Sequence, residues 1–361
     1  MSVGSSVFSD LAVHHVEFHV TDAVWAAREL AGQYGFAVVG SRQAEDHLSV
    51  ALRQGSTILV VTEGLTDGHP ASLYVQQHGD GVADLALRTA DARAAFEVAV
   101  SRGARAVIEP AARDGFVTAT VGGFGDVTHT FVQPPEGSAG PVLPGLTPGL
   151  PDGQVPEAGP APGLGVVDHL AVCLESGTLD PTVDFYRTVL DFDVTFVEHI
   201  LVGKQAMFSK VVQSPSRLVT LTLIEPDASA AAGQIDDFLK GHGGPGVQHL
   251  ALCSTDIVSA ISALTDRGVE FLRTPDTYYD RLGQRLDLAR YDVGQLQSRN
   301  ILVDEDHDGQ LFQIFARSTH PRRTFFFEVI ERLGARTFGS GNIRALYEAV
   351  EAERTQTHDV L

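Results

Sequence analysis

Short stretches of alternating apolar and polar residues recur along the chain, and each is followed by a helical pattern. VHHVEFHV (13–20) and VVDHLAVCL (166–174) have the period of two that is typical of a strand with one buried face. In DPTVDFYRTVLDFDVTF the apolar residues Val183, Tyr186 and Leu190 follow the spacing of a helix instead. NILVDEDHDGQLFQIFA places two apolar runs around an Asp-Gly turn, which predicts a β-hairpin.

Two of these units align without a gap. GVADLALRTADARAAFEVAVSRGARAVIEP begins at Gly81, and GVQHLALCSTDIVSAISALTDRGVEFLRTP begins at Gly246. The order of strand, helix and several further strands occurs four times, which indicates an internal repeat. We therefore predict an α+β fold in which curved sheets could enclose a pocket.

A segment rich in proline and glycine divides the four units into two pairs. Residues 135–165 read PEGSAGPVLPGLTPGLPDGQVPEAGPAPGLG, a composition that disfavours both helix and central strand. We predict an N-terminal domain at 1–134, a linker at 135–165 and a C-terminal domain at 166–361. The alternative is a long surface loop within one domain, but structureless loops of this length are uncommon in compact domains.

The charge and the apolar content exclude several classes of partner. A formal charge of -20 argues against nucleic acid, which binds through clustered Lys and Arg, and no basic cluster near the termini suggests a membrane surface. We find no signal-peptide pattern and no apolar run long enough to span a bilayer. Two cysteines cannot form a disulfide framework. We expect a soluble cytoplasmic protein.

The repeat also points to a metal site. His169 and His249 occupy equivalent strands, and Glu328 lies in the aromatic strand TFFFEVIER. A carboxylate buried among phenylalanines is costly unless it is paired or binds a metal. Two histidines and one carboxylate with open positions form the facial triad of non-haem Fe(II) oxygenases. In the first half His15 matches His169, but Asp84 replaces His249 and no acid matches Glu328.

Other interpretations of these residues are weaker. Each histidine alone would more often be a core residue, and a lone strand Glu would more often face water; their convergence favours the metal site. DEDHDG (304–309) begins like a calcium loop, but Phe315 stands where that loop needs Glu. The cluster of His14, His15 and His19 lacks an acid or a cysteine partner. No glycine loop indicates nucleotide binding, and no G-x-S-x-G motif indicates a serine hydrolase.

At this point the chain resembles a known family. GVQHLAL, DEDHDGQLFQIF, FFFEVIER and FGSGNIRALYEAVE are similar to motifs of the 4-hydroxyphenylpyruvate dioxygenases and their sister enzymes, the hydroxymandelate synthases, in the vicinal oxygen chelate superfamily. The resemblance spans nearly the whole chain. It implies two domains of paired βαβββ modules forming open curved-sheet barrels, as in glyoxalase-like folds. It also implies Fe(II) bound by His169, His249 and Glu328, a metal-free first half, and a C-terminal helix that closes the pocket.

The same resemblance implies a substrate pocket. Gln248 also matches a pocket residue, but as the neighbour of His249 on a regular strand it should point the other way. Where the dioxygenases usually have P-I-N-E-P and G-N-F, this chain has TLIEP (222–226) and GNI (341–343), which look like the hydroxymandelate synthases. The pocket residues that the resemblance implies are Ser209, Gln234, Gln313, Phe315 and Phe326. Thr222, Ile224, Asn342 and Ile343 are added from the two stretches that differ between the dioxygenases and the synthases.

The resemblance thus implies an enzyme that converts 4-hydroxyphenylpyruvate and O2 to 4-hydroxymandelate, as a supply of hydroxyphenylglycine for a peptide antibiotic. The substrate brings its own 2-oxo acid, so no separate 2-oxoglutarate is needed. The alternatives are a dioxygenase that makes homogentisate in tyrosine catabolism, a non-catalytic binding protein of the same fold, and a related isomerase or extradiol enzyme using Zn or Mn. A homodimer is left open.

Overall fold

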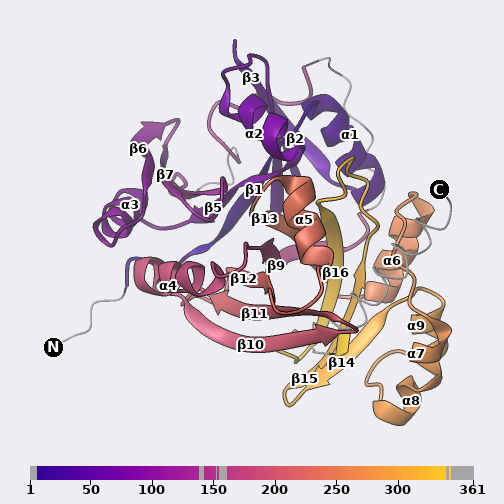
Figure 1. Cartoon of the computed structure of the whole chain (residues 1–361). Coiled ribbons are helices and arrows are strands. Elements are labelled where there is room, and N and C mark those ends of the chain that lie inside the picture. The colour runs from indigo at the N-terminus through magenta and orange to yellow at the C-terminus, as the bar shows by residue number, and fades with distance from the viewer. Residues whose placement is uncertain (1–5, 138–141, 152, 154–160, 339–340, 343–361) are drawn as a thin grey trace.

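The computed structural model describes residues 6–137, 142–151, 153, 161–338 and 341–342. Its two halves lie one above the other in Figure 1, with the N-terminal half at the top. The expected closing helix at the C-terminus and the site residue Ile343 lie outside the described residues. Among the described residues, no helix is long and apolar enough to cross a membrane.

The N-terminal half is built on one eight-stranded sheet in the order β2-β3-β4-β1-β5-β8-β7-β6. The central strands β1 and β5 run antiparallel, while β1 pairs with β4 in parallel and β5 pairs with β8 in parallel. Two βαβββ units therefore meet along β1 and β5. The elements are β1 (Ala12–His19), α1 (Ala23–Tyr34), β2 (Ala37–Gln43), β3 (His47–Gln54), β4 (Thr57–Gly64), α2 (Pro70–His78), β5 (Gly81–Arg88), α3 (Ala92–Ser101), β6 (Ala106–Arg113), β7 (Phe116–Gly122) and β8 (Thr128–Gln133).

The C-terminal half repeats this topology in the order β10-β11-β12-β9-β13-β16-β15-β14. Its central antiparallel pair is β9 and β13. The elements are β9 (Leu164–Cys173), α4 (Leu179–Leu190), β10 (Asp193–Val202), β11 (Gln205–Gln213), β12 (Thr220–Pro226), α5 (Gln234–His242), β13 (Gly246–Ser254), α6 (Ile257–Asp266), α7 (Asp276–Asp280), α8 (Leu282–Arg285), α9 (Val293–Gln297), β14 (Leu302–Asp306), β15 (Gly309–Phe315) and β16 (Phe326–Leu333). The predicted α+β fold of curved sheets is confirmed.

Local chemistry explains where the helices lie. Asp22 and Asp256 cap α1 and α6 by accepting hydrogen bonds from backbone amides of the first turn. Gly35 ends α1 with φ 72°, a left-handed conformation that favours glycine. The predicted helix around Val183, Tyr186 and Leu190 is α4, and all three side chains are buried. These helices cover the sheets and leave part of each opposite face available for a site.

The predicted linker is partly structured. Val142 and Leu150 are buried, and Thr147 forms an isolated β-bridge with Ser41 of β2. Strand β9 begins at Leu164, two residues before the expected start of the C-terminal domain at 166. The stretch around Val142 therefore packs on the N-terminal sheet, where it clusters with Ala51 and Val60, because its few apolar residues are buried there.

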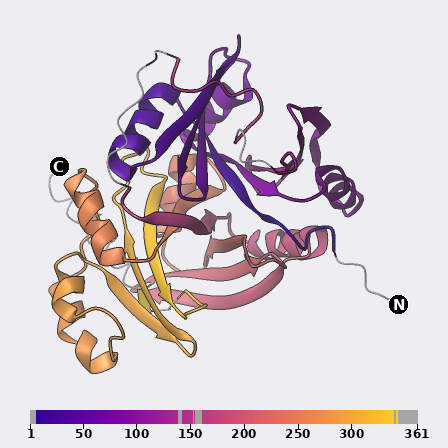
Figure 2. The ribbon, with the colours of Figure 1, turned by 180° about the vertical axis from the view of Figure 1, so that it is seen from behind.

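Buried contacts join the two halves. The ring of His78 at the end of α2 stacks on His242 at the end of α5, with centroids 4.3 Å apart, and the Tyr186 hydroxyl of α4 lies 2.7 Å from His129 Nε2 of β8. The largest cluster of buried hydrophobic side chains includes residues of both halves. Figure 2 shows the halves in contact from behind.

Candidate metal centre

His169, His249 and Glu328 converge on the concave face of the C-terminal sheet. They come from β9, β13 and β16, which are neighbours in the sheet. In the register, Ala251 of β13 lies opposite both His169 and Glu328, and His249 precedes it by two residues on the same face. Ala251 carries only a methyl group, so the two longer side chains flanking it have room to approach one another.

The geometry of these three groups suits a metal ion. Glu328 Oε2 lies 3.4 Å from His169 Nε2 and 3.3 Å from His249 Nε2, and the three residues are 2–6% exposed. Imidazole nitrogen and carboxylate oxygen bind a first-row metal at about 2.1 Å, so two ligand atoms at right angles lie about 3 Å apart. Three donors on one side of an ion leave its remaining positions open to other molecules.

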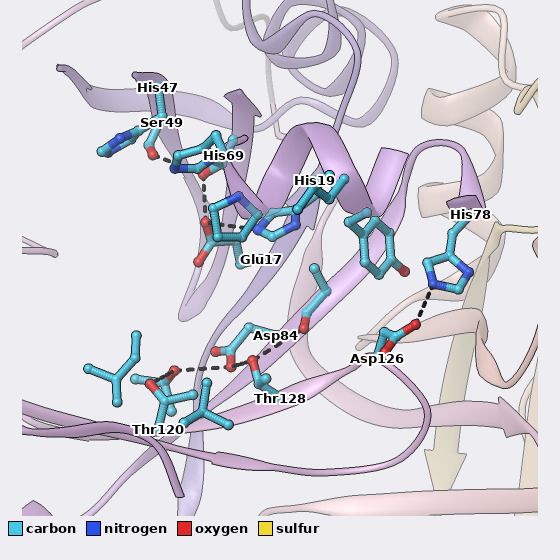
Figure 3. Close-up of a pocket in the computed structure, with 18 of the residues that line it drawn as sticks. Glu17, His19, His47, Ser49, His69, His78, Asp84, Thr120, Asp126 and Thr128 are labelled. Carbon is cyan, nitrogen blue, oxygen red and sulfur yellow. Dashed lines mark hydrogen bonds and ion pairs between the residues drawn. The ribbon is translucent and has the colours of Figure 1, made fainter. Parts of the chain in front are cut away.

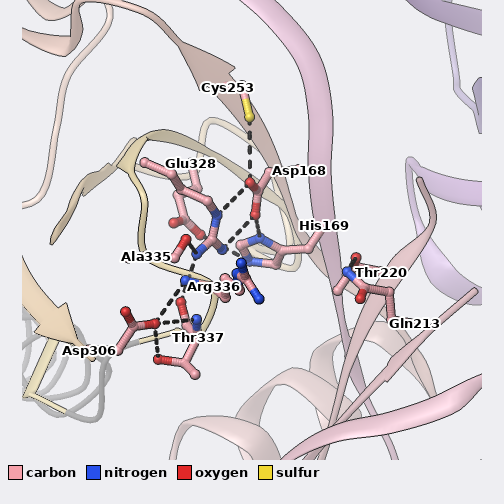
Figure 4. A network of polar contacts seen from close by, with 11 residues as sticks. Asp168, His169, Gln213, Thr220, Cys253, Asp306, Glu328, Ala335, Arg336 and Thr337 are labelled. Carbon is pink, nitrogen blue, oxygen red and sulfur yellow. Dashed lines mark hydrogen bonds and ion pairs between the residues drawn. The ribbon is translucent and has the colours of Figure 1, made fainter. Parts of the chain in front are cut away.

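Asp168 and Arg332 orient His169, and Figure 4 shows the Asp168 carboxylate beside the His169 ring. His169 Nδ1 donates a hydrogen bond to Asp168 Oδ1 at 2.8 Å, which directs Nε2 toward Glu328 and the metal position. The Arg332 guanidinium binds both oxygens of the same carboxylate, at 2.8 and 2.9 Å. Cys253 Sγ also contacts this carboxylate, at 3.4 Å. The chain of contacts fixes the ring plane and the tautomer of His169.

The electrostatics of the site favour a cation. Burial would lower the pKa of His169, but the carboxylates of Glu328 and Asp168 raise it to about 9. Burial would likewise raise the pKa of Glu328, but the two histidines hold it below its usual value. Burial lowers the pKa of His249, and its Nδ1 atom has no hydrogen-bond partner. The arrangement therefore holds an ionised carboxylate beside imidazoles, where a metal ion can take the place of a proton.

Most of the expected pocket residues lie on the same concave face as the three ligands. Phe326 stacks on the His249 ring with centroids 5.0 Å apart, and the Phe315 ring lies 6.0 Å from the same ring. Phe315 is paired with Glu328 across β15 and β16, and Gln313 lies two residues earlier on the same face. These side chains form an aromatic wall beside the metal position.

The other side of the concave face comes from β11 and β12. Ser209 is paired with Ile224, and Thr222 is paired with Ala171, which lies opposite His249. Thr222 Oγ1 is buried without a hydrogen-bond partner, so a polar group of a bound molecule could satisfy it. Ile224 packs in a cluster with Ile235 and Phe238 of α5.

Three further expected residues are buried in the C-terminal half, and one of them, Gln248, lies at a register shift in β13. Gln234 is the first residue of α5 and is buried. Asn342 is fully buried, and its backbone amide donates to Asp304 Oδ2 of β14 at 3.3 Å. Gln248 is buried next to His249 on β13.

Sequence reasoning missed three residues that support the ligands. Asp168 and Arg332 are described above, and the Phe338 ring lies 4.7 Å from the His169 ring, edge to face. The Asp-His dipeptide at 168–169 was the available signal for the carboxylate. Arg332 and Phe338 had no such signal, because their contact with β9 depends on the sheet register and on the path of the chain after β16.

In the DEDHDG turn, backbone amides occupy the carboxylate of Asp306, which is partly buried. Asp306 Oδ1 accepts hydrogen bonds from the amides of Asp308 and Gly309 in the turn between β14 and β15. Its other oxygen accepts from the amides of Arg336 and Thr337. The backbone thus occupies this carboxylate, and the turn closes the predicted hairpin.

The chain matches known proteins over nearly its whole length. A family profile described as "Hydroxyphenylpyruvate dioxygenase, HPPD, N-terminal" matches residues 10–139. A second profile, "Glyoxalase/Bleomycin resistance protein/Dioxygenase superfamily", matches residues 166–314. The chain is 33% identical to the 4-hydroxyphenylpyruvate dioxygenase of Dictyostelium discoideum, over 94% of this chain and 97% of that protein. The chain belongs to the 4-hydroxyphenylpyruvate dioxygenase family. The Danio rerio member is 34% identical, over 95% of this chain and 91% of that protein.

The chain also resembles solved structures of two enzyme types. A triple variant of 4-hydroxymandelate synthase from Streptomyces coelicolor is 42% identical, with a TM-score of 0.83 over 95% of this chain and 98% of that chain. A fusion of a xylose isomerase-like TIM barrel with a 4-hydroxyphenylpyruvate dioxygenase shares the fold, with a TM-score of 0.75, 23% identity and coverage of 95% of this chain and 52% of that one. The chain is thus a dioxygenase of the vicinal oxygen chelate fold, related to both enzyme types.

Proposed function

We propose that the chain is an iron(II)-dependent 4-hydroxymandelate synthase. The observation that carries the proposal is the buried set of two histidines and one glutamate, which faces an aromatic wall and lies on the same concave face as Ile224. The reaction converts 4-hydroxyphenylpyruvate and O2 into 4-hydroxymandelate and CO2. One oxygen atom enters the new carboxylate, and the other enters the benzylic hydroxyl group.

The residues present fit iron(II) by their chemistry and spacing. His169, His249 and Glu328 would hold the ion on one side, which is the arrangement of non-haem Fe(II) oxygenases. When bound, iron(II) supplies sites for the 2-oxo-acid group and for O2, and it provides the electrons that activate O2. Asp168 holds the His169 ring in the orientation that this set requires.

The chain's own side chains would position the substrate ring. Phe326 and Phe315 offer faces and edges for an aromatic ring close to His249. Ser209 and Thr222 supply hydroxyl groups on the opposite strands for the polar end of the substrate. The surrounding apolar side chains exclude water, so that a reactive centre is protected from side reactions.

Ile224 supports benzylic oxidation over attack on the ring. Ile224 packs against α5 and offers no hydrogen bond to the substrate. The asparagine of the dioxygenase motif P-I-N-E-P could offer one, so the substrate ring is free to take a different position here. Because reacting atoms must lie about 3–3.5 Å apart, a small displacement of the ring decides which carbon is oxidised. Ile343, in the stretch GNI, is proposed to act in the same way. The product would serve as a precursor of hydroxyphenylglycine in a peptide antibiotic.

A single product assay tests the proposal. Anaerobically purified protein is loaded with Fe(II) and 4-hydroxyphenylpyruvate, O2 is admitted, and the product is identified by NMR, because the two candidate products are isomers. We expect 4-hydroxymandelate. Homogentisate would show instead the activity of the sister dioxygenases, and no product from an iron-loaded protein would favour a non-catalytic binding role.

Two variants test the pocket. Ile224→Asn and Ile343→Phe should each raise the share of homogentisate, and Val197→Ile, at an exposed position of β10, serves as a conservative control. If neither variant makes more homogentisate than the parent, these isoleucines do not set the product.

A further inference from the structure

The N-terminal half contains a cavity of about 520 Å³ on the concave face of its own sheet. Figure 3 shows side chains from several strands around it, including Glu17, Asp84 and Thr128. It corresponds by topology to the metal-bearing face of the other half, and the proposed function makes no use of it.

The register identifies which residues replace the metal ligands. His15 lies opposite Ala86, as His169 lies opposite Ala251. Asp84 lies opposite Thr128, as His249 lies opposite Phe326, so Thr130 takes the place of Glu328. A carboxyl group and a hydroxyl group therefore stand where the other half has a histidine and a glutamate.

The cavity floor has hydrogen-bond acceptors in excess. Glu17 and Asp84 lie directly opposite each other on β1 and β5, so their side chains share one face. Asp84 Oδ1 accepts from the Thr128 and Thr130 hydroxyls at 2.5 and 3.0 Å. Asp84 is only 6% exposed, yet its Oδ2 atom has no hydrogen-bond partner. A buried acceptor of this kind is costly unless a bound molecule donates to it.

Apolar side chains form part of the cavity wall, beside Arg42 and several histidines that also line it. Leu73, Val107 and Ile108 line the cavity and are 53%, 40% and 57% exposed. Large apolar side chains left open to water beside a cavity are suited to the hydrophobic part of a ligand. A fitting molecule would therefore carry hydrogen-bond donors at one end and an apolar group at the other.

We propose that this cavity is a second ligand site, which binds a small organic amine. The protonated amino group donates to Asp84 Oδ2 and faces Glu17, and the apolar body of the ligand contacts Leu73, Val107 and Ile108. An ammonium group fits because it supplies three donors and a positive charge opposite two carboxyl groups.

A metal ion fits this cavity less well. Among the described residues, the candidate ligand group that touches the cavity is Asp46, His47 and His69. His47 Nδ1 already contacts the Asp46 carboxylate at 2.7 Å, and its Nε2 lies 2.8 Å from the Arg42 guanidinium. The Arg42 guanidinium would repel a metal ion bound at His47. Glu17 and Asp84 lie on β1 and β5, away from this arginine on β2.

The test uses the full-length protein loaded with Fe(II) under argon. The probe is 2-phenylethylamine, and 2-phenylethanol is the matched compound with a hydroxyl group in place of the ammonium group. Calorimetry measures the dissociation constants, and the methyl NMR signal of Ile108, assigned with Ile108→Val, reports binding at the cavity. Asp84→Asn keeps the Oδ1 acceptor for Thr128 and Thr130 but replaces the carboxyl group, which a bound ammonium group would ionise, with a neutral amide. Asp114→Asn, on the exposed β6–β7 turn, is the control.

We expect the amine to bind at least about tenfold more tightly than the alcohol and to shift the Ile108 signal. Asp84→Asn should weaken binding of the amine by about tenfold or more, whereas Asp114→Asn and Glu328→Gln should leave it unchanged. Equal binding of the two compounds, an unchanged affinity in Asp84→Asn, or binding that leaves Ile108 unshifted would each overturn the proposal. None of these outcomes depends on which product the enzyme makes.

Discussion

Glu328 is the residue that contacts both histidines of the candidate metal centre, through the same oxygen atom. Glu328→Gln keeps the size of the side chain but replaces an ionised ligand with a neutral amide. We expect iron affinity to fall by about 100-fold and turnover to fall with it, since loss of even a supporting residue costs 10–100-fold. Iron titration followed by the product assay measures both effects, with the exposed Glu270→Gln as the control. Full iron binding in Glu328→Gln would remove it from the ligand set.

Asp84 should make the stability of the protein depend on pH. Burial, with the nearby Glu17 carboxylate, raises the pKa of Asp84 to about 8. Between the unfolded value near 4 and this value, the folded protein keeps a proton that the unfolded chain loses, so stability decreases as pH rises through this range. Asp84→Asn removes this titration.

The parent should therefore lose stability relative to Asp84→Asn between pH 5 and pH 8. The loss is about 1.4 kcal/mol for each pH unit by which folding raises the pKa of Asp84. Urea unfolding of both proteins at several pH values measures the difference. Groups common to both proteins cancel in this comparison. A difference that stays constant with pH would show that Asp84 is ionised in the folded protein.

At the residue scale, the sequence predicted the candidate metal ligands but not the residues that hold them in place. His169 and His249 were found because the repeat placed them on equivalent strands, and Glu328 because a carboxylate among phenylalanines is unusual. Asp168 and Arg332 are 164 residues apart and meet only because β9, β13 and β16 are neighbours in one sheet. No local pattern encodes that contact.

At the element scale, α4 is tied to β8 of the other half by one buried hydrogen bond. Burial lowers the pKa of His129 to about 4, so its ring is neutral near pH 7. The neutral ring accepts from the Tyr186 hydroxyl at Nε2, while Nδ1 faces the Leu85 carbonyl at 3.2 Å. The bond therefore satisfies two polar groups that have no access to water.

Tyr186→Phe leaves the His129 acceptor buried and unsatisfied. We expect the free energy of unfolding to fall by about 1–3 kcal/mol. Removing both partners, in Tyr186→Phe with His129→Leu, should cost less than the sum of the two single changes. Denaturant unfolding of the four proteins measures this coupling, and strict additivity would argue against a structural role for the bond.

The predicted elements were most accurate where a periodic pattern was long enough to show. The β14–β15 hairpin and α4 were predicted from their apolar spacing and are present. The helices α7, α8 and α9 were not predicted, since each has only four or five residues and completes little more than one turn. Such short helices leave no periodic pattern and depend on contacts with the rest of the domain.

At the scale of the whole molecule, iron binding should stabilise the folded chain, because an ion held by three strands is lost when they separate. With free Fe(II) at about 100 times its dissociation constant, the gain is about 2.7 kcal/mol. Anaerobic calorimetry with and without Fe(II) should show a higher unfolding temperature for the parent, and no such shift for Glu328→Gln. An equal shift in both proteins would indicate binding elsewhere.

The internal repeat predicted the common topology of the two halves, which the matching strand orders confirm. It could not predict how the halves meet. The stacking of His78 on His242 joins the ends of α2 and α5 across 164 residues, and the segment around Thr147 packs on β2. These contacts depend on surface shape rather than on a repeated pattern.

The division of the ligands between two units has a consequence for how such a protein can change over generations. His169 comes from one βαβββ unit, and His249 and Glu328 come from the next, so neither unit holds the complete set. A single substitution in either unit would break this set, whereas building the same set in the N-terminal half requires at least Asp84→His and Thr130→Glu together, beside the existing His15. The set is therefore far easier to lose than to build, and a half without it is free to accumulate side chains suited to a different ligand.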